Sequence, residues 1–213
     1  MKTRDRILLT SLELFNTEGE PNVTTVDIAN ELDISPGNLY YHFKGKEDII
    51  SALYEHFHEE LSEILNAPIA KLLKPDDAWF YLYLVFDEIF KQRYFYRNLT
   101  DILQRYPAID KKFRRLLEQK VRAAQAIAIT LVEKGVLELQ PHQLDRLCET
   151  VTMQVTFWLN YDMLRSKDLP QQLLIHQGVF QVMSMIAPHL TDTYRSFYDD
   201  CCALYESLIA DLI

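Results

Sequence analysis

Apolar residues recur at helical spacing along nearly the whole chain, and polar residues fill the positions between them. In residues 3–18, for example, Ile7, Leu12 and Phe15 fall on one helical face, and Gly19 follows as a C-terminal stop. With only 5 glycines and 8 prolines among 213 residues, the pattern predicts an all-α fold. Beyond the first fifty residues or so, helices are predicted over residues 46–66, 75–92, 94–105, 107–134, 141–165, 169–188 and 191–212.

Two short helices joined by a tight turn are predicted on either side of Asp33. The first begins at Thr24 or Thr25, either of which can cap it. The second covers about 36–43, with Ser35 as its N-cap. The turn between them needs a left-handed residue, and Asp tolerates that backbone better than most non-glycine residues. This pattern is typical of a helix-turn-helix, whose second helix enters the major groove of DNA.

The segment SPGNLYYHFKGK, residues 35–46, has an unusual composition for a helix of a packed core, because it offers only Leu39 and Phe43 for burial. A groove-facing role explains the rest: glycine allows close approach, and amide, hydroxyl and imidazole groups reach bases or phosphates. Each tyrosine taken alone would more simply be the edge of a core. The whole set, with its cap and flanking lysines, favours DNA contact. The members of the segment that this role assigns to DNA are Gly37, Asn38, Tyr40, Tyr41, His42, Lys44 and Lys46.

The segments RILLTSLELFNTEG and TTVDIANELDISPGNLYYHFKGKEDII resemble the DNA-binding domain of the TetR/AcrR family of bacterial transcriptional regulators. The resemblance covers residues 3–50, and Asp33 departs from the glycine that the family often has there. It implies a three-helix DNA-binding domain over residues 1–47 and a larger helical effector-binding and dimerisation domain over 48–213. It also implies phosphate contacts by Thr25 and Lys46 and a groove-facing set of Ser35, Gly37, Asn38, Tyr40, Tyr41 and His42.

The charge of the chain limits how it can bind DNA. The formal net charge is −9, and residues 1–50 hold five basic side chains against nine acidic ones. Because phosphate binding needs concentrated Lys and Arg, we expect modest non-specific affinity for DNA. This acidity supports one alternative, a helical ligand-binding or interaction protein with a weak DNA-binding domain. A transcriptional activator is a further alternative that the sequence leaves open.

Aromatic residues crowd two of the later predicted helices, in stripes of three- and four-residue steps. Two such faces can line an apolar cavity with polar tips, although a plain packed core explains them equally well. An arginine beside the cavity would suit an acidic head group, but Arg97 is equally able to pair with Asp101. The predicted ligand-binding residues are Tyr83, Phe86, Phe90, Tyr94, Arg97, Gln125, Gln154, Phe157, Trp158 and Tyr161.

A single recognition helix reads too few bases, so we expect a homodimer on a palindromic operator, with two half-sites one DNA turn apart. The family resemblance implies pairing through late helices, here residues 141–165 and one of the last two. The family resemblance therefore implies a ligand-responsive DNA-binding transcriptional regulator. We expect a repressor that leaves its operator when a small hydrophobic effector binds.

Other chemistry has little support in the sequence. His56 and Glu60 share a helical face, but no third strong ligand accompanies them, so we predict no metal and no cofactor. No nucleophile elbow, phosphate loop or paired catalytic signature is present, so no enzyme is predicted. Three cysteines without framework spacing fit a reducing cytosol. Together with the lack of a signal peptide or an apolar run of spanning length, they predict a cytoplasmic protein that does not contact the membrane.

Overall fold

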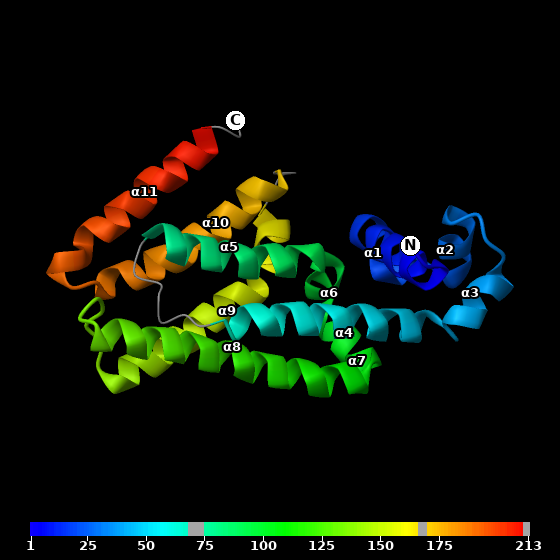
Figure 1. Ribbon diagram of the computed structural model, residues 1–213, viewed down its shortest axis with the longest axis horizontal. Helices are drawn as coiled ribbons and strands as arrows, with labels where there is room; N and C mark the ends of the chain where they lie inside the picture. Colours follow the sequence, from blue (N-terminus) through cyan, green and yellow to red (C-terminus); the bar gives the residue numbers. More distant parts are fainter. Residues whose placement is uncertain (68–74, 166–169, 211–213) are drawn as a thin grey trace. The chain divides into compact units, whose positions relative to one another are not determined.

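The computed structural model describes residues 1–67, 75–165 and 170–210, and within these ranges the regular elements are all helical apart from one isolated β-bridge (Figure 1). The predicted all-α architecture, a helix-turn-helix followed by a larger helical part, is confirmed. The helices are α1 (Thr3–Glu18), η1 (Glu20–Asn22), α2 (Thr25–Glu31), α3 (Pro36–His42), α4 (Lys46–Leu65), α5 (Pro75–Lys91), α6 (Arg93–Arg97), α7 (Leu99–Arg105), α8 (Pro107–Glu133), α9 (Pro141–Arg165), α10 (Gln171–Ile186), η3 (Ala187–His189), η4 (Asp192–Tyr194) and α11 (Arg195–Ala210).

The chain forms two compact units, each assembled from two stretches of sequence. Unit 1 comprises Met1–Glu60 and Lys91–Arg114, and unit 2 comprises Leu61–Phe90 and Arg115–Ile213. The helix α4 begins in unit 1 and ends in unit 2. The predicted domain boundary after residue 47 falls inside unit 1, and it stays a prediction.

Local side-chain bonds define the two helices of the helix-turn-helix. The hydroxyl of Thr24 accepts a hydrogen bond from the backbone of Asp27 (3.2 Å), whose carboxylate accepts one from the backbone of Thr24 (2.8 Å), which is a reciprocal capping box. Ser35 caps α3 by accepting from the backbone N–H of Asn38 (3.2 Å). Asp33 has a φ of 52°, so the predicted left-handed turn is confirmed.

Unit 1 has a core made of aliphatic and aromatic side chains. Leu39 and Phe43, the two apolar residues predicted to anchor α3, are both buried. A second cluster joins α4, α6 and the start of α8, where the rings of Phe57, Phe95 and Phe113 lie in tilted contacts. Because these rings come from three helices, their packing holds together the two sequence stretches of unit 1.

The predicted helix 94–105 is instead two helices, α6 and α7, separated at Asn98 (φ −114°, ψ 27°). Tyr94, Phe95 and Tyr96 are consecutive and all buried. Three consecutive residues of a straight helix span about 200° and cannot share one face. All three lie in α6, so this short helix is packed around most of its circumference, which periodicity alone did not indicate.

The late helices differ from prediction at their ends. The segment predicted as a helix from residue 191 first forms η4, and α11 starts only at Arg195. Its predicted end at 212 lies outside the described residues, as does residue 169 at the predicted start of the preceding helix. That helix, α10, ends at Ile186, and Pro188 lies in η3 because proline cannot donate the next helical hydrogen bond.

In unit 2, α10 packs on α9 and on α11, the orange-to-red helix of Figure 1. Gly178 of α10 makes the close approach to α5 possible. A Cβ at this position would lie 2.7 Å from a ring carbon of Phe86. Phe86 is itself fully buried and meets Trp158 of α9 edge-on at 5.0 Å between centroids. The glycine therefore sits where α5, α9 and α10 meet.

We expect Gly178→Ala to lower the free energy of unfolding by about 1–2 kcal/mol, because overpacking outweighs the ordinary helix preference for alanine. Urea unfolding of the purified variant measures this. The matched control is Gly37→Ala in α3, where the added Cβ would come only within 3.9 Å of Ser35; it should leave stability unchanged or slightly raise it. A stabilised Gly178→Ala protein would contradict the close contact.

Candidate nucleic-acid interface and C-terminal cavity

The helix α3 has one anchored side and one exposed side. Leu39 is buried, whereas Tyr40 and Tyr41 on its other side are 53% and 80% exposed. The Tyr41 and His42 rings meet edge-on, with their centroids 5.2 Å apart. A short helix that exposes two tyrosines has surface to offer a partner, because side chains with large apolar bodies are normally covered.

The remaining predicted DNA-contacting residues lie around this helix. Thr25 is the first residue of α2 and is half-buried. Lys44 is exposed in the link to α4, where its backbone N–H donates to the carboxylate of Asp48 (2.9 Å). Ser35, Gly37 and Asn38 are exposed at the N-terminal end of α3, and His42 is half-buried at its C-terminal end. The structure leaves the whole predicted set, Lys46 included, at least partly accessible.

Lys46 has a different environment from the one the sequence suggested. Its ammonium group donates to the backbone oxygens of Glu20 and Val23 (2.8 Å to Val23) and pairs with the carboxylate of Glu20 at 2.8 Å. An ammonium group has three protons, and these three acceptors use them all. The side chain is therefore occupied within unit 1, where it fixes the start of α4 to the segment after α1.

Glu20 is the centre of an ionic cluster that the sequence did not reveal. Its carboxylate is fully buried and receives two hydrogen bonds from the guanidinium group of Arg105 in addition to the contact with Lys46. Arg105 also pairs with Asp101 (2.7 Å). Burial alone would raise the pKa of Glu20, but the bonds from Arg105 and Lys46 outweigh it and hold the pKa below its usual value.

Asn16 makes a second link between the two sequence stretches of unit 1. Its amide nitrogen donates to the backbone oxygen of Lys91 (2.8 Å), and its oxygen accepts from the backbone N–H of Tyr94 (3.0 Å). The Tyr94 ring lies 5.3 Å from that of Phe15. Tyr94, predicted to bind ligand, is thus buried in the core of unit 1.

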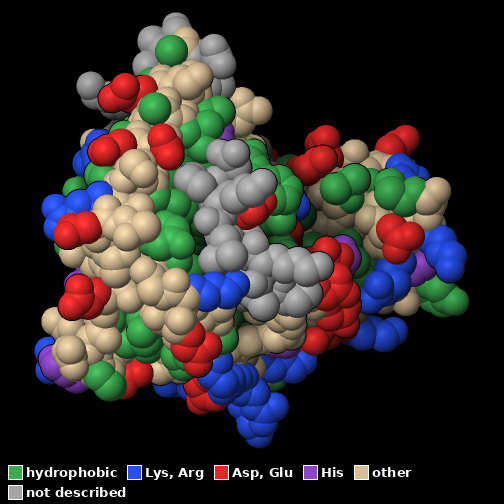
Figure 2. All heavy atoms as spheres, turned by 60° about the vertical axis from the view of Figure 1, so that its left-hand side comes forward, with side chains coloured by type: hydrophobic (Ala, Val, Ile, Leu, Met, Phe, Trp, Pro, Cys, Tyr) green, Lys and Arg blue, Asp and Glu red, His purple; other side chains and the backbone are tan. Residues whose placement is uncertain are grey.

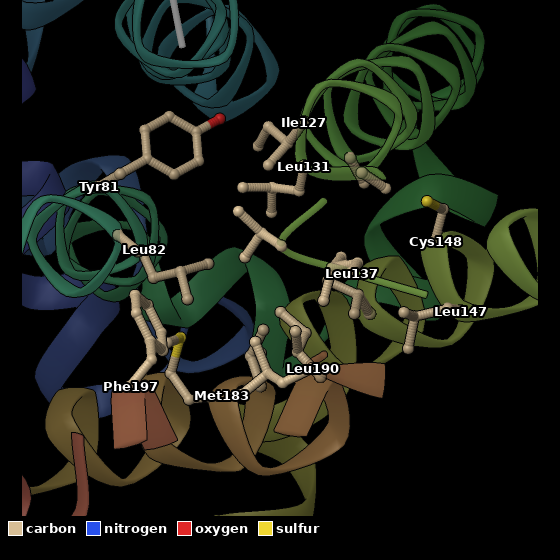
Figure 3. Close-up of a pocket in the computed structure, with 17 residues that line it drawn as sticks. Tyr81, Leu82, Ile127, Leu131, Leu137, Leu147, Cys148, Met183, Leu190 and Phe197 are labelled. Atoms are coloured by element: carbon tan, nitrogen blue, oxygen red, sulfur yellow. The ribbon is translucent and has the colours of Figure 1, made fainter. Parts of the chain in front are cut away.

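A cavity of about 120 Å³ lies within unit 2, among α5, α8, α9, α10 and α11. Figure 3 shows Tyr81 and Leu82 on one side, Leu137, Leu147 and Cys148 on another, and Met183, Leu190 and Phe197 below. Among the described residues, those that line the cavity have aliphatic or aromatic side chains almost throughout. Their only heteroatoms are the Tyr81 hydroxyl, the Cys148 thiol and the Met183 thioether.

The predicted ligand-binding residues do not line this cavity, as far as the described part of the chain goes. The structure disperses them over both units. Phe86 and Trp158 pack on each other, Phe90 is buried, and Tyr83 lies beside His176. Gln125 forms a hydrogen bond with Asp145, and Gln154 forms one with Gln181. Phe157 and Tyr161 are exposed, and Tyr94 and Arg97 belong to unit 1. Of the ten, Phe86 and Trp158 share a direct ring contact.

One face of α9 carries exposed apolar side chains. Met153, Phe157, Tyr161 and Leu164 are 59%, 46%, 57% and 84% exposed, and their spacing places them along one side of the helix. We refer to these four residues as the α9 stripe. A continuous row of large exposed apolar residues marks an interaction surface, and α9 corresponds to the helix that the sequence nominated for dimerisation.

The capped α2–α3 pair, with its left-handed turn and exposed second helix, defines a helix-turn-helix protein of the DNA-binding class. Figure 2 shows acidic (red) and basic (blue) side chains interspersed over the visible face. Because the formal net charge of the chain is −9, attraction to DNA must come from locally placed basic groups. In the described ranges, no helix has the length and apolar character needed to cross a bilayer.

Known proteins give the same class. The profile of the bacterial regulatory proteins of the tetR family matches residues 7–53, and that of a bacterial transcriptional repressor domain matches residues 56–198. The chain therefore belongs to the TetR family of bacterial transcriptional regulators. The three relatives described next are also transcriptional regulators.

A crystal structure of a TetR-family transcriptional regulator from Marinobacter aquaeolei VT8 is similar over 98% of this chain and 99% of its own, with 35% identity and a TM-score of 0.87. The probable HTH-type transcriptional regulator YttP of Bacillus subtilis is 22% identical over 201 residues, which are 94% of this chain and 90% of YttP. The regulator QacR of Staphylococcus aureus is 45% identical over 49 residues, which are 23% of this chain and 26% of QacR.

Proposed function

We propose that this TetR-family regulator is a homodimeric repressor that binds a palindromic operator through α3 and leaves it when a small hydrophobic effector binds in unit 2. The observation that carries the DNA-binding part is the division of α3 into a buried side, with Leu39, and an exposed side, with Tyr40 and Tyr41. A helix packed only for stability would not leave both rings exposed.

The proposed base and phosphate contacts follow from residue chemistry. Gly37 lets the backbone approach the groove, and Asn38 offers an amide that can pair with adenine or reach a phosphate. The tyrosine hydroxyls and His42 supply donors to phosphates, while their rings contact sugars or thymine methyl groups. Lys44 is the proposed basic phosphate contact, because the ammonium group of Lys46 is already held by Glu20.

The dimer is proposed from the geometry of DNA and from the α9 stripe. A single α3 of seven residues covers a few base pairs, so a specific operator requires a second copy one helical turn away. The α9 stripe gives two copies a self-complementary apolar surface, as a two-fold symmetric interface requires.

Effector binding is proposed to act through population shift. A ligand that binds the conformation unable to bind DNA more tightly than the DNA-binding conformation lowers the affinity for the operator. The loss of operator affinity cannot exceed the difference between the ligand's two affinities. The proposed carrier of the change is α4, because it begins in unit 1, where Lys46 fixes its first turn to Glu20, and ends in unit 2.

The test of DNA binding is a salt titration on a palindrome from the promoter next to the gene. We expect Lys44→Ala to weaken binding and to reduce the slope of log K against log salt by about 0.9, the value for one lost phosphate contact. Fluorescence anisotropy measures both quantities. Lys111→Ala, which removes an exposed lysine of α8, is the control and should keep the wild-type slope. An unchanged slope in Lys44→Ala would refute the phosphate contact.

The alternative, a helical ligand-binding protein with a weak DNA-binding domain, is favoured by the excess of acidic over basic side chains in residues 1–50. This alternative predicts that the protein shows no sequence-specific binding to any palindromic DNA at physiological salt. A reporter gene placed behind the operator separates repression from activation, since deletion of the regulator raises expression in the first case and lowers it in the second.

A further inference from the structure

We propose that the effector is a compact, uncharged, largely apolar molecule that occupies the cavity among α5, α8, α9, α10 and α11. This inference rests on the proposed function and deepens it in two respects. It gives the site a place, away from the aromatic residues that the sequence nominated. It also gives the ligand a chemical class.

The lining of the cavity decides the charge of the ligand. Within the part of the chain that the structure describes, no lining residue carries a charged side chain. An ionised ligand would lose its hydration without gaining a counter-ion or a set of hydrogen bonds, which costs several kcal/mol or more. A neutral apolar ligand loses little and gains dispersion contacts with leucine, isoleucine and valine side chains.

The volume of the cavity decides the size of the ligand. At about 120 Å³ it is slightly smaller than the apolar cavity of about 150 Å³ that binds benzene in an engineered protein. Ala78, Ala124 and Ala128 provide this space, because each places only a methyl group where a larger residue would fill the cavity. A single ring or a short alkyl group therefore matches the space.

The two hydrogen-bearing heteroatoms of the lining are both neutral. Burial raises the pKa of the Tyr81 phenol to about 12, so that at physiological pH it is an uncharged hydroxyl able to donate one hydrogen bond to a ligand oxygen. Burial, followed by the nearby carboxylate of Asp145, raises the pKa of the Cys148 thiol to about 11. That thiol is protonated and unreactive at neutral pH, which argues for reversible binding rather than covalent capture.

The cavity also touches the parts of unit 2 that a ligand would need to move. Val136, Leu137 and Leu190 line it, and they belong to the links before α9 and before α11. These links are tied by a β-bridge between Leu137 and Leu190 and by a hydrogen bond from the Thr191 backbone N–H to the Val136 oxygen (3.0 Å). A ligand that pushes the lining residues apart would therefore displace both links together.

The helix α9 connects the cavity with the proposed dimer surface. Leu147, Cys148 and Val151 face the cavity, and the α9 stripe begins at Met153, within one turn of Val151. A small shift of α9 caused by the ligand would change the geometry between the two copies. The separation of the two recognition helices would change with it.

The test uses three probes of one shape: benzyl alcohol, benzoate and benzylammonium. Calorimetry measures their binding to the full-length protein, and anisotropy measures release of the operator. We expect the neutral alcohol to bind at least about tenfold more tightly than either ion, from the cost of burying their charge. Equal or tighter binding of an ionic probe would overturn the proposal.

Two variants locate the probe. Ala128→Leu should fill the cavity and abolish binding of benzyl alcohol, whereas Ala126→Leu, an exposed position on the same helix, should bind like the wild type. Tyr81→Phe keeps the shape of the lining. It should weaken benzyl alcohol about three- to tenfold, the loss of one neutral hydrogen bond, and leave toluene unaffected. Wild-type binding by both Ala128→Leu and Tyr81→Phe would place the ligand elsewhere and overturn the proposal.

Failure of this inference and failure of the proposed function give different results. Operator binding measured without any probe tests the proposed function, and the cavity variants should retain it. Binding of the neutral probe without release of the operator would show that the occupant of the cavity is not the effector and would overturn the inference. A protein that binds the probe as expected but binds no operator would contradict the proposed function and support only the class of ligand.

Discussion

Replacement of Phe157 by aspartate is expected to convert the protein into a monomer and to weaken its binding to a palindromic operator by about 10²- to 10⁴-fold, the range lost when bivalent binding becomes monovalent. The physical reason is the position of Phe157 in the α9 stripe, between Met153 and Tyr161. In a symmetric interface the substitution appears twice, so that two carboxylates would have to be buried without partners.

Light scattering coupled to size-exclusion chromatography measures the mass, and anisotropy measures operator affinity. The control is Phe80→Asp. Phe80 is also in unit 2 and is 63% exposed, but it lies on α5 and outside the stripe. Phe80→Asp should remain a dimer with wild-type affinity. A dimeric Phe157→Asp protein, or a monomer with unchanged affinity for the full palindrome, would contradict the assigned interface.

Glu20→Gln is the second substitution with a large expected effect, and it should lower the free energy of unfolding by about 3 kcal/mol. The carboxylate of Glu20 is fully buried and joins Arg105 of α7 to Lys46 of α4. A neutral amide cannot compensate these two partly buried cations, and its nitrogen would oppose their donor groups. Chemical denaturation at pH 7 measures the change.

The effect of Glu20→Gln should depend on pH in a defined direction. The pKa of Glu20 is lowered in the folded protein from its ordinary value of 4.5. The stabilisation by the carboxylate is therefore fully present above about 4.5 and is lost as the pH falls through the lower folded-state pKa. We expect the stability difference between wild type and Glu20→Gln to shrink in acid.

Asp101→Asn provides the control for Glu20, because Asp101 also pairs with Arg105 but is 59% exposed. An exposed pair of this kind contributes about 0–1 kcal/mol, so Asp101→Asn should be nearly silent at every pH. If the two substitutions cost the same, the burial of Glu20 would not be the source of its stabilisation.

Much of the helix-turn-helix could be predicted because its signals are local. The cap at Ser35, the left-handed backbone at Asp33 and the burial of Leu39 each depend on residues within a few positions along the chain. The start of α9 at Pro141 and the end of α1 before Gly19 were predictable for the same reason.

The cavity proposed as the ligand site could not be predicted in this way. Tyr83, Phe86 and Phe157 form aromatic stripes in the sequence, but a stripe has the same period whether it meets a core, a cavity or solvent. The structure buries Phe86 and exposes Phe157. The cavity is instead lined by alanines and aliphatic residues, which in sequence look like any helix core.

The class of protein follows from residues 24–46 alone, because they encode a capped recognition helix with exposed polar-tipped rings. Which groups act together depends on the packing of the helices. It brought Glu20, Lys46 and Arg105 into one ionic cluster and left the cavity beside Ala128. The physical reason is that caps and turns are set by neighbouring residues, whereas charge pairing and empty space depend on how distant helices pack.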